Sequence, residues 1–157
     1  MARYSAGRSN YGGGWSEDPV KWFRAKVQQV EEEVAMEIWQ AVEDGEATMK
    51  HHIETRGTGK TWEKPWDGRD GSSPGRVASG KMVDAVGSSF NYDYSSGKVS
   101  ARFGWIKPSQ IEDYFGYQEG GFDHAQAGVT VEGMYALVDA YELVNQELAE
   151  RIKKIGN

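Results

Sequence analysis

The chain has 157 residues, a formal net charge of −6 and no cysteine. Leu, Ile, Val and Phe make up 27 of the 157 residues, which is below the ~20% that indicates disorder when net charge is high. The modest charge and the many Trp and Tyr residues argue against a wholly disordered chain. The lack of cysteine excludes disulfides and thiol catalysis, and no apolar run approaches the ~18 residues of a membrane helix. The composition predicts one small domain whose core is completed by partner molecules.

Residues 1–15 are predicted to form a flexible arm, because they are rich in Gly, Ser and Asn and offer little to bury. Tyr11 lies within the arm, and Trp15 is the last residue of the arm, shortly before the predicted start of a helix. These two aromatic residues are candidate anchors to a neighbouring molecule, and a floppy terminus is the alternative. Residues 16–157 are predicted to form a single domain. No apolar segment typical of a secretory signal is visible at the start of the chain, and the absence of cysteine fits an intracellular origin.

Asp18 and Pro19 are typical of the start of a helix. Apolar residues then recur at steps of three and four and form one stripe: Val20, Phe23, Val27, Val30, Val34, Ile38, Ala41 and Val42. If the helix continues past Gly45 to about Glu54, it spans ~50 Å. A helix of this length with one narrow stripe indicates contact with something outside its own fold, and packing on the domain's own sheet is the alternative. Acidic residues occupy the rest of its surface: Glu31, Glu32, Glu33, Glu37, Glu43 and Asp44.

Residues 55–80 are predicted to form an extended loop, because they contain six Gly and two Pro. Trp62 and Trp66 lie in this polar segment and are candidate interface anchors, unless they fold back onto the domain. Gly57 to Thr61 resembles a phosphate-binding loop. However, Glu54 stands where that pattern requires glycine, and no apolar strand precedes it, so we reject a nucleotide site.

The second half of the chain is predicted to contain a short helix, a hairpin and a terminal helix. Ser79–Val86 favours a short helix capped by Ser79. Alternating apolar residues on both sides of Ser95–Gly97 predict a β-hairpin. The aromatic-rich segment from Ile111 to Phe122 predicts a further strand, and the apolar steps after Gly133 predict a helix that stops at Gly156. The expected fold class is therefore α+β: a long N-terminal and a C-terminal helix packed on a small antiparallel sheet.

Residues that carry chemistry are sparse. The three histidines are His51, His52 and His124, and the adjacent pair would point to different faces of a helix, so they cannot easily share one metal ion. His124 follows Asp123, but no nucleophile is identifiable beside them. The sequence therefore predicts no catalytic, cofactor-binding or metal-binding residues and a protein that is not an enzyme.

The order of several motifs resembles a known family. Ser79–Val86 has the pattern Ser-Gly-x-Met-x-x-Ala-Val, residues 114–122 read Tyr-Phe-Gly-Tyr-Gln-Glu-Gly-Gly-Phe, and residues 131–137 read Val-Glu-Gly-Met-Tyr-Ala-Leu before the last helix. This order is similar to that of the tail-completion or neck-protein (gene-ten-like) family of long-tailed bacteriophages, most of all to versions from phages of actinobacteria. The chain departs from the family's pattern in lacking the prolines before the last helix and in having Gly120 where the family has an aromatic.

The resemblance implies a virion structural protein of the head-to-tail connector, assembled in the host cytoplasm. It implies an oligomeric ring, often sixfold, that completes the top of the tail and joins it to the head connector and to the tail terminator or tube proteins. Genomic DNA would pass through the ring without specific binding, and an acidic lining would repel its phosphates. Candidate lining residues are Glu31, Glu32, Glu33, Glu37 and Glu43, although a merely solvated face would look the same. Alternatives are a tail-terminator or head-completion stopper ring, or an acidic DNA-mimic binding protein.

Overall fold

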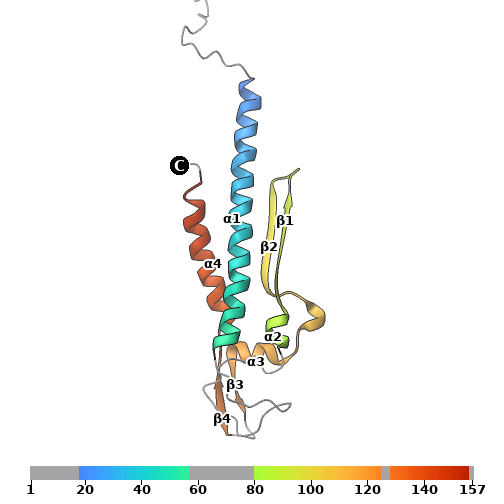
Figure 1. Cartoon of the computed structure of the whole chain (residues 1–157), viewed down its shortest axis with the longest axis vertical. Coiled ribbons are helices and arrows are strands. Elements are labelled where there is room, and N and C mark those ends of the chain that lie inside the picture. The colour runs from blue at the N-terminus through green and yellow to red at the C-terminus, as the bar shows by residue number, and fades with distance from the viewer. Residues whose placement is uncertain (1–17, 57–79, 125–127, 156–157) are drawn as a thin grey trace, which may run out of the picture.

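The computed structural model describes residues 18–56, 80–124 and 128–155, and within these ranges the fold is α+β, as predicted (Figure 1). The described elements are, in chain order, α1 (Pro19–Thr55), α2 (Lys81–Asp84), β1 (Val86–Asp93), β2 (Lys98–Trp105), η2 (Pro108–Gln110), α3 (Tyr114–Gly120), β3 (Gly121–His124), β4 (Val129–Glu132) and α4 (Ala136–Ile152). The strands form two antiparallel pairs, β1 with β2 and β3 with β4.

The long N-terminal helix is confirmed, with 37 residues in α1, or ~55 Å of length. It begins as the sequence predicts: the carboxylate of Asp18 accepts a hydrogen bond of 3.0 Å from the backbone N–H of Val20, and Pro19 occupies the first turn. The helix ends at Thr55, one residue beyond the predicted Glu54. Its interior Gly45 does not interrupt it, because that glycine is buried against neighbouring elements.

α1 is the central element, with α4 on one side and the β1–β2 hairpin on the other (Figure 1). α4 runs antiparallel to α1, as the ion pairs at its two ends show: Arg56 with Asp139 at 2.6 Å, and Arg151 with Asp44 at 2.7 Å. The core lies around the C-terminal half of α1, where the buried residues gather: Met49, Ile53, Met82, Ala85, Val86, Phe115, Met134, Ala136 and Ala140.

The predicted hairpin is confirmed and is longer than the alternation suggested. β1 begins at Val86, which pairs with Trp105, and the register runs to Asp93 opposite Lys98. Val86 therefore belongs to a strand and not to the preceding helix. The indole N–H of Trp105 donates to the carbonyl oxygen of Met82 at 3.0 Å, which ties the base of the hairpin to α2.

Two sequence predictions for the short elements were wrong. The segment Ile111–Phe122, expected to form a strand, instead contains the helix α3, and the strand β3 begins only at Gly121. A helix is favoured here because it buries Phe115 against Trp105, with ring centroids 5.3 Å apart. The short helix α2 has only four residues and Gly80 at its N-cap, with no side-chain cap; Ser79 lies outside the described residues.

α4 confirms the predicted terminal helix, but it ends at Ile152 and not at the predicted stop near Gly156. It also does not bury its most apolar stripe. The side that faces α1 consists of small residues, Ala136, Ala140 and Val144, all of them buried. Small side chains allow the two helix backbones to approach closely. Val138 and the larger Tyr141 and Ile152 are left exposed.

Candidate interaction surfaces

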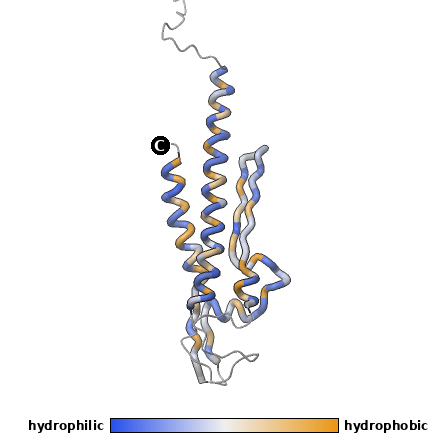
Figure 2. Tube along the Cα trace, viewed as in Figure 1, coloured by the Kyte–Doolittle hydropathy of each residue, from blue (hydrophilic) through white to orange (hydrophobic). Residues whose placement is uncertain are grey.

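The N-terminal part of α1 extends beyond both α4 and the hairpin (Figure 1), and every residue from 19 to 33 is exposed. We call residues 19–34 the free end of α1, although its last turn, from Glu31 onward, lies beside the hairpin turn at Gly97. Its apolar side chains remain accessible, with exposed fractions of 55% for Val20 and 63% for Phe23. Hydrophobic and hydrophilic residues alternate along it with helical period (Figure 2). The stripe predicted from the sequence therefore exists, but only its C-terminal part is covered by the protein's own core.

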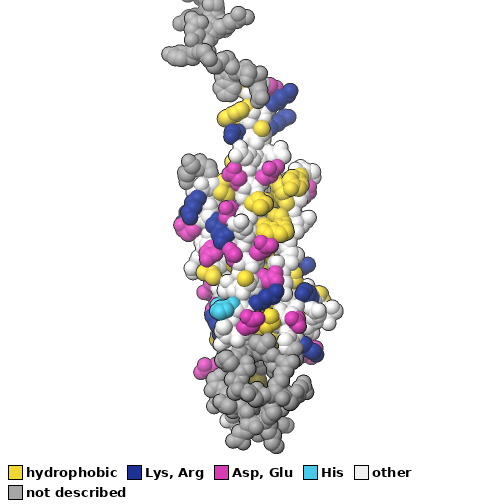
Figure 3. Space-filling model, in the orientation of Figure 1, with side chains coloured by type: hydrophobic (Ala, Val, Ile, Leu, Met, Phe, Trp, Pro, Cys, Tyr) yellow, Lys and Arg dark blue, Asp and Glu magenta, His cyan; other side chains and the backbone are white. Residues whose placement is uncertain are grey.

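An aromatic surface lies where the hairpin packs beside α1. Trp39 of α1 contacts Phe90 of β1 edge to face, with ring centroids 4.9 Å apart, and Tyr92 and Tyr94 are 4.5 Å apart. Tyr94 is 75% exposed and Trp39 41% exposed. Figure 3 shows hydrophobic side chains gathered beside α1 at the level of the hairpin. Burial raises the pKa of the Tyr92 phenol, and the nearby carboxylate of Glu31 raises it further.

A second apolar surface lies on the outer face of α4, on the other side of α1. Val138, Tyr141 and Ile152 are all exposed there. Clusters of exposed apolar side chains on a small protein indicate contact with other molecules. The molecule thus presents different apolar surfaces on two sides, the aromatic surface of the hairpin and the outer face of α4.

The five acidic residues proposed from the sequence all lie on α1, but they do not form one face. A Cβ at Gly97, in the hairpin turn, would lie 3.2 Å from Oε1 of Glu31, so Glu31 faces the hairpin. Glu37 lies 3.8 Å from the guanidinium of Arg151 and so faces α4. The others are exposed, and Glu32 and Glu43 point in nearly the same direction at about 100° per residue. Because consecutive residues of a helix point about 100° apart, Glu31, Glu32 and Glu33 point in three different directions from the helix axis.

A polar cluster joins the C-terminal end of α1 to the start of α4. The guanidinium of Arg56 donates to the carbonyl oxygen of Met134 and to the carboxylate of Asp139 at 2.6 Å, and its other nitrogen lies 3.3 Å from the His52 ring. Burial lowers the pKa of His52, and the positive charge of Arg56 lowers it further. His52 is therefore held neutral, as a structural part of the joint between the helices.

The motif Tyr-Gln-Glu-Gly-Gly has a structural explanation that the sequence alone did not reveal. The carboxylate of Glu119 accepts hydrogen bonds from the first backbone N–H groups of α4: Ala136 at 3.0 Å, Leu137 at 2.8 Å and Val138 at 3.2 Å. An acidic group at a helix N-terminus satisfies unpaired donors and complements the helix dipole. A Cβ at Gly133 would lie 2.6 Å from the carbonyl oxygen of Glu119. Gly133 therefore permits the close approach that places this cap.

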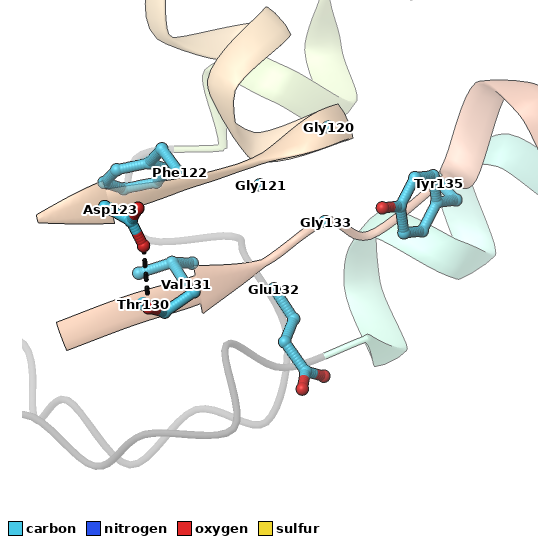
Figure 4. A pocket seen from close by; sticks show the side chains of 9 residues that line it. All are labelled: Gly120, Gly121, Phe122, Asp123, Thr130, Val131, Glu132, Gly133 and Tyr135. Carbon is cyan, nitrogen blue, oxygen red and sulfur yellow. Dashed lines mark hydrogen bonds between the residues drawn. The ribbon is translucent and has the colours of Figure 1, made fainter.

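A hollow of about 590 Å³ lies along β3 and β4. Figure 4 shows Phe122 and Asp123 from β3 beside Thr130 and Val131 from β4, with Tyr135 turned toward Gly133. The hydroxyl of Thr130 donates to the carboxylate of Asp123 at 2.7 Å, so this carboxylate is engaged across the strand pair. This arrangement braces the two short strands. The side chain of His124, the candidate base considered with Asp123, lies outside the described part of the chain.

Four predicted anchors, Tyr11, Trp15, Trp62 and Trp66, lie outside the described residues, as do the arm over 1–15 and most of the loop over 55–80. Among residues 18–56, 80–124 and 128–155, no group of three or more His, Asp or Glu side chains could hold a metal ion. Within the same described ranges, no helix is both long and apolar enough to cross a membrane. Comparison with known protein families, curated proteins and solved structures finds no significant match for this chain.

Proposed function

We propose that the protein is a structural subunit of the head-to-tail connector of a long-tailed bacteriophage, and that it forms a ring through which DNA passes. The observation that carries the proposal is the presence of different exposed apolar surfaces on two sides of α1: the outer face of α4 and the aromatic surface of the hairpin. A head-to-tail contact between unlike surfaces generates a closed ring when the rotation between subunits closes. A self-complementary patch would give only a dimer.

The motif order given above supports the same proposal independently of the surfaces. Within the subunit, the motif over residues 114–122 supplies Glu119, whose carboxylate caps the N-terminus of α4. In the proposed ring, the sixfold order, the neighbouring head and tail proteins and the virion location follow from the resemblance to neck proteins. Exposed Glu32 and Glu43, which share one side of α1, are the best candidates to face the channel.

The test is assembly of the purified full chain, measured by light scattering and negative-stain imaging. We expect closed rings with a hole wide enough for duplex DNA. Tyr141→Asp on α4 and Tyr94→Asp at the hairpin should each abolish ring closure, because burying an unpaired charge at an interface is costly. Tyr117→Asp is the matched control, since Tyr117 is 62% exposed on α3, away from both surfaces.

Mixing the two interface variants distinguishes a ring from other assemblies. Each variant keeps one intact surface, so in the mixture the ring contact should join one Tyr94→Asp subunit to one Tyr141→Asp subunit and should not close a ring. A full chain that stays monomeric at every concentration would overturn the ring and would favour the acidic binding protein instead. Equal ring formation by the Tyr141→Asp and Tyr117→Asp variants would also overturn the proposed contact.

A further inference from the structure

The free end of α1 has an apolar stripe that continues the one buried in the core. At about 100° per residue, Val20, Phe23, Val27, Val30 and Val34 fall within one sector about 80° wide. Ala41 and Gly45 lie in the same sector of the helix, and both are buried. The stripe therefore passes from the protein's own core to a segment where every residue from 19 to 33 is exposed. The exposed part has the pattern of a helix surface that packs against another helix.

Charge is segregated along the free end. Lys21, Arg24 and Lys26 lie in its first half, and Glu31, Glu32 and Glu33 lie in its second half. Figure 3 shows basic side chains at the tip of α1 and acidic ones below them. A second copy of the same helix, running in the opposite direction, would place its acidic half beside this basic half. In a parallel pair, like charges would meet.

We propose that the free ends of α1 from two copies of this chain pair as antiparallel helices. The apolar stripes of the two copies align in one antiparallel register. In it, Phe23 lies opposite Val34 of the second copy, and Val27 lies opposite Val30 of the second copy. This register makes the contact identical for both copies, as a twofold dimer requires. The same register also determines which charges meet at the two edges of the stripe.

The charges on both edges of the stripe are complementary in this register. At about 100° per residue, Arg24 and Glu31 lie on one edge, and Lys26 and Glu33 lie on the other. In an antiparallel helix pair each edge faces the same edge of the second helix. Arg24 therefore meets Glu31 of the other copy, and Lys26 meets Glu33. Glu31 is also close to the hairpin turn at Gly97, which restricts where its carboxylate lies.

The proposed contact is small, because the free end is only ~22 Å long at 1.5 Å per residue. A standard stable interface buries about 1,200–2,000 Å², and two short helices bury less. We therefore expect a dimer with a dissociation constant in the micromolar range. The pairing goes beyond the proposed ring, since it uses neither the outer face of α4 nor the aromatic surface of the hairpin.

Charge reversal tests the pairing in the full chain. The double variant R24E/K26E and the double variant E31K/E33K should each dimerise at least ten-fold more weakly by sedimentation equilibrium, since attraction becomes repulsion at four positions. Mixing the two variants should restore a dimer, because one then carries only acidic and the other only basic edges. The variant that combines all four substitutions, R24E/K26E/E31K/E33K, should also dimerise. Circular dichroism verifies that each variant keeps its helix content.

A short bis-maleimide cross-linker tests the direction of the pairing, because the chain has no cysteine of its own. A mixture of F23C and V34C should cross-link efficiently, and F23C alone should not. Efficient cross-linking of F23C alone would overturn the antiparallel register. A dimer equally strong in R24E/K26E would overturn the pairing itself, while leaving ring closure through Tyr94 and Tyr141 to its own test.

Discussion

Substitution of Gly45 by alanine is expected to destabilise the protein, although helix propensity alone predicts the opposite. In a helix interior, alanine is favoured over glycine by about 1 kcal/mol. At Gly45, however, an added Cβ would lie 2.8 Å from Cε1 of Phe103 on β2 and 2.8 Å from Cγ2 of Val144 on α4. Because the two contacts come from elements on different sides of α1, the helix cannot move away from one without approaching the other.

The magnitude follows from these opposing effects. Overpacking of a well-packed core costs about 1–3 kcal/mol, and the gain in propensity offsets about 1 kcal/mol of that. We expect Gly45→Ala to lower the free energy of unfolding by up to about 2 kcal/mol. For a chain of this size, each 1 kcal/mol corresponds to about 2–4 °C in Tm. Urea denaturation followed by circular dichroism at 222 nm measures the change.

Matched variants separate the steric effect from propensity. Gly116→Ala on α3 has no neighbouring atom within 4 Å, so it should be neutral or stabilising by up to about 1 kcal/mol. Phe103→Leu should recover part of the loss when combined with Gly45→Ala, because it removes the ring atoms that clash. If Gly45→Ala stabilises the protein as much as Gly116→Ala does, the close three-element contact is refuted.

Three further predictions concern the joints between elements. Glu119→Ala should lower the free energy of unfolding by about 1–2 kcal/mol in urea denaturation, because α4 loses its N-terminal cap, whereas the exposed Glu142→Ala should change it little. Arg56→Ala should lower the free energy of unfolding by only about 1 kcal/mol, since the partly exposed cluster is screened by solvent. Arg56→Lys should lose less stability than Arg56→Ala. Unchanged stability in Arg56→Ala would contradict a role of Arg56 in joining α1 to α4. His52 has a lowered pKa in the folded state, so the unfolded chain takes up its proton first as pH falls below about 6.5. Stability should therefore decrease between pH 7.5 and 5.5, and His52→Gln should show a smaller decrease by thermal denaturation.

Much of the fold could be predicted from local pattern. Asp18 and Pro19 mark the start of α1 correctly, and the alternation around Ser95–Gly97 predicts the hairpin. The region from Ile111 to Phe122 could not be predicted in this way. Its aromatic residues suit a strand by propensity, but burying Phe115 beside Trp105 requires a helix there. Tertiary packing overrides propensity at that segment.

For the candidate surfaces too, the sequence predicted some features, and the tertiary structure decided others. The sequence predicted a long helix with one narrow apolar stripe, because the period of the stripe is a local property. It did not show where the stripe leaves the core, which depends on how far α4 and the hairpin reach along α1. The separation of Glu31 from Glu37 likewise depends on which elements lie beside each side of the helix.

By itself, the sequence determined the two helices and the hairpin, since these follow from residue spacing. Only the tertiary structure decided that Ala136 and Ala140, and not Val138 and Tyr141, face α1. The physical reason is that close helix packing selects small side chains at the contact. Val138 and Tyr141 are thereby left exposed on α4.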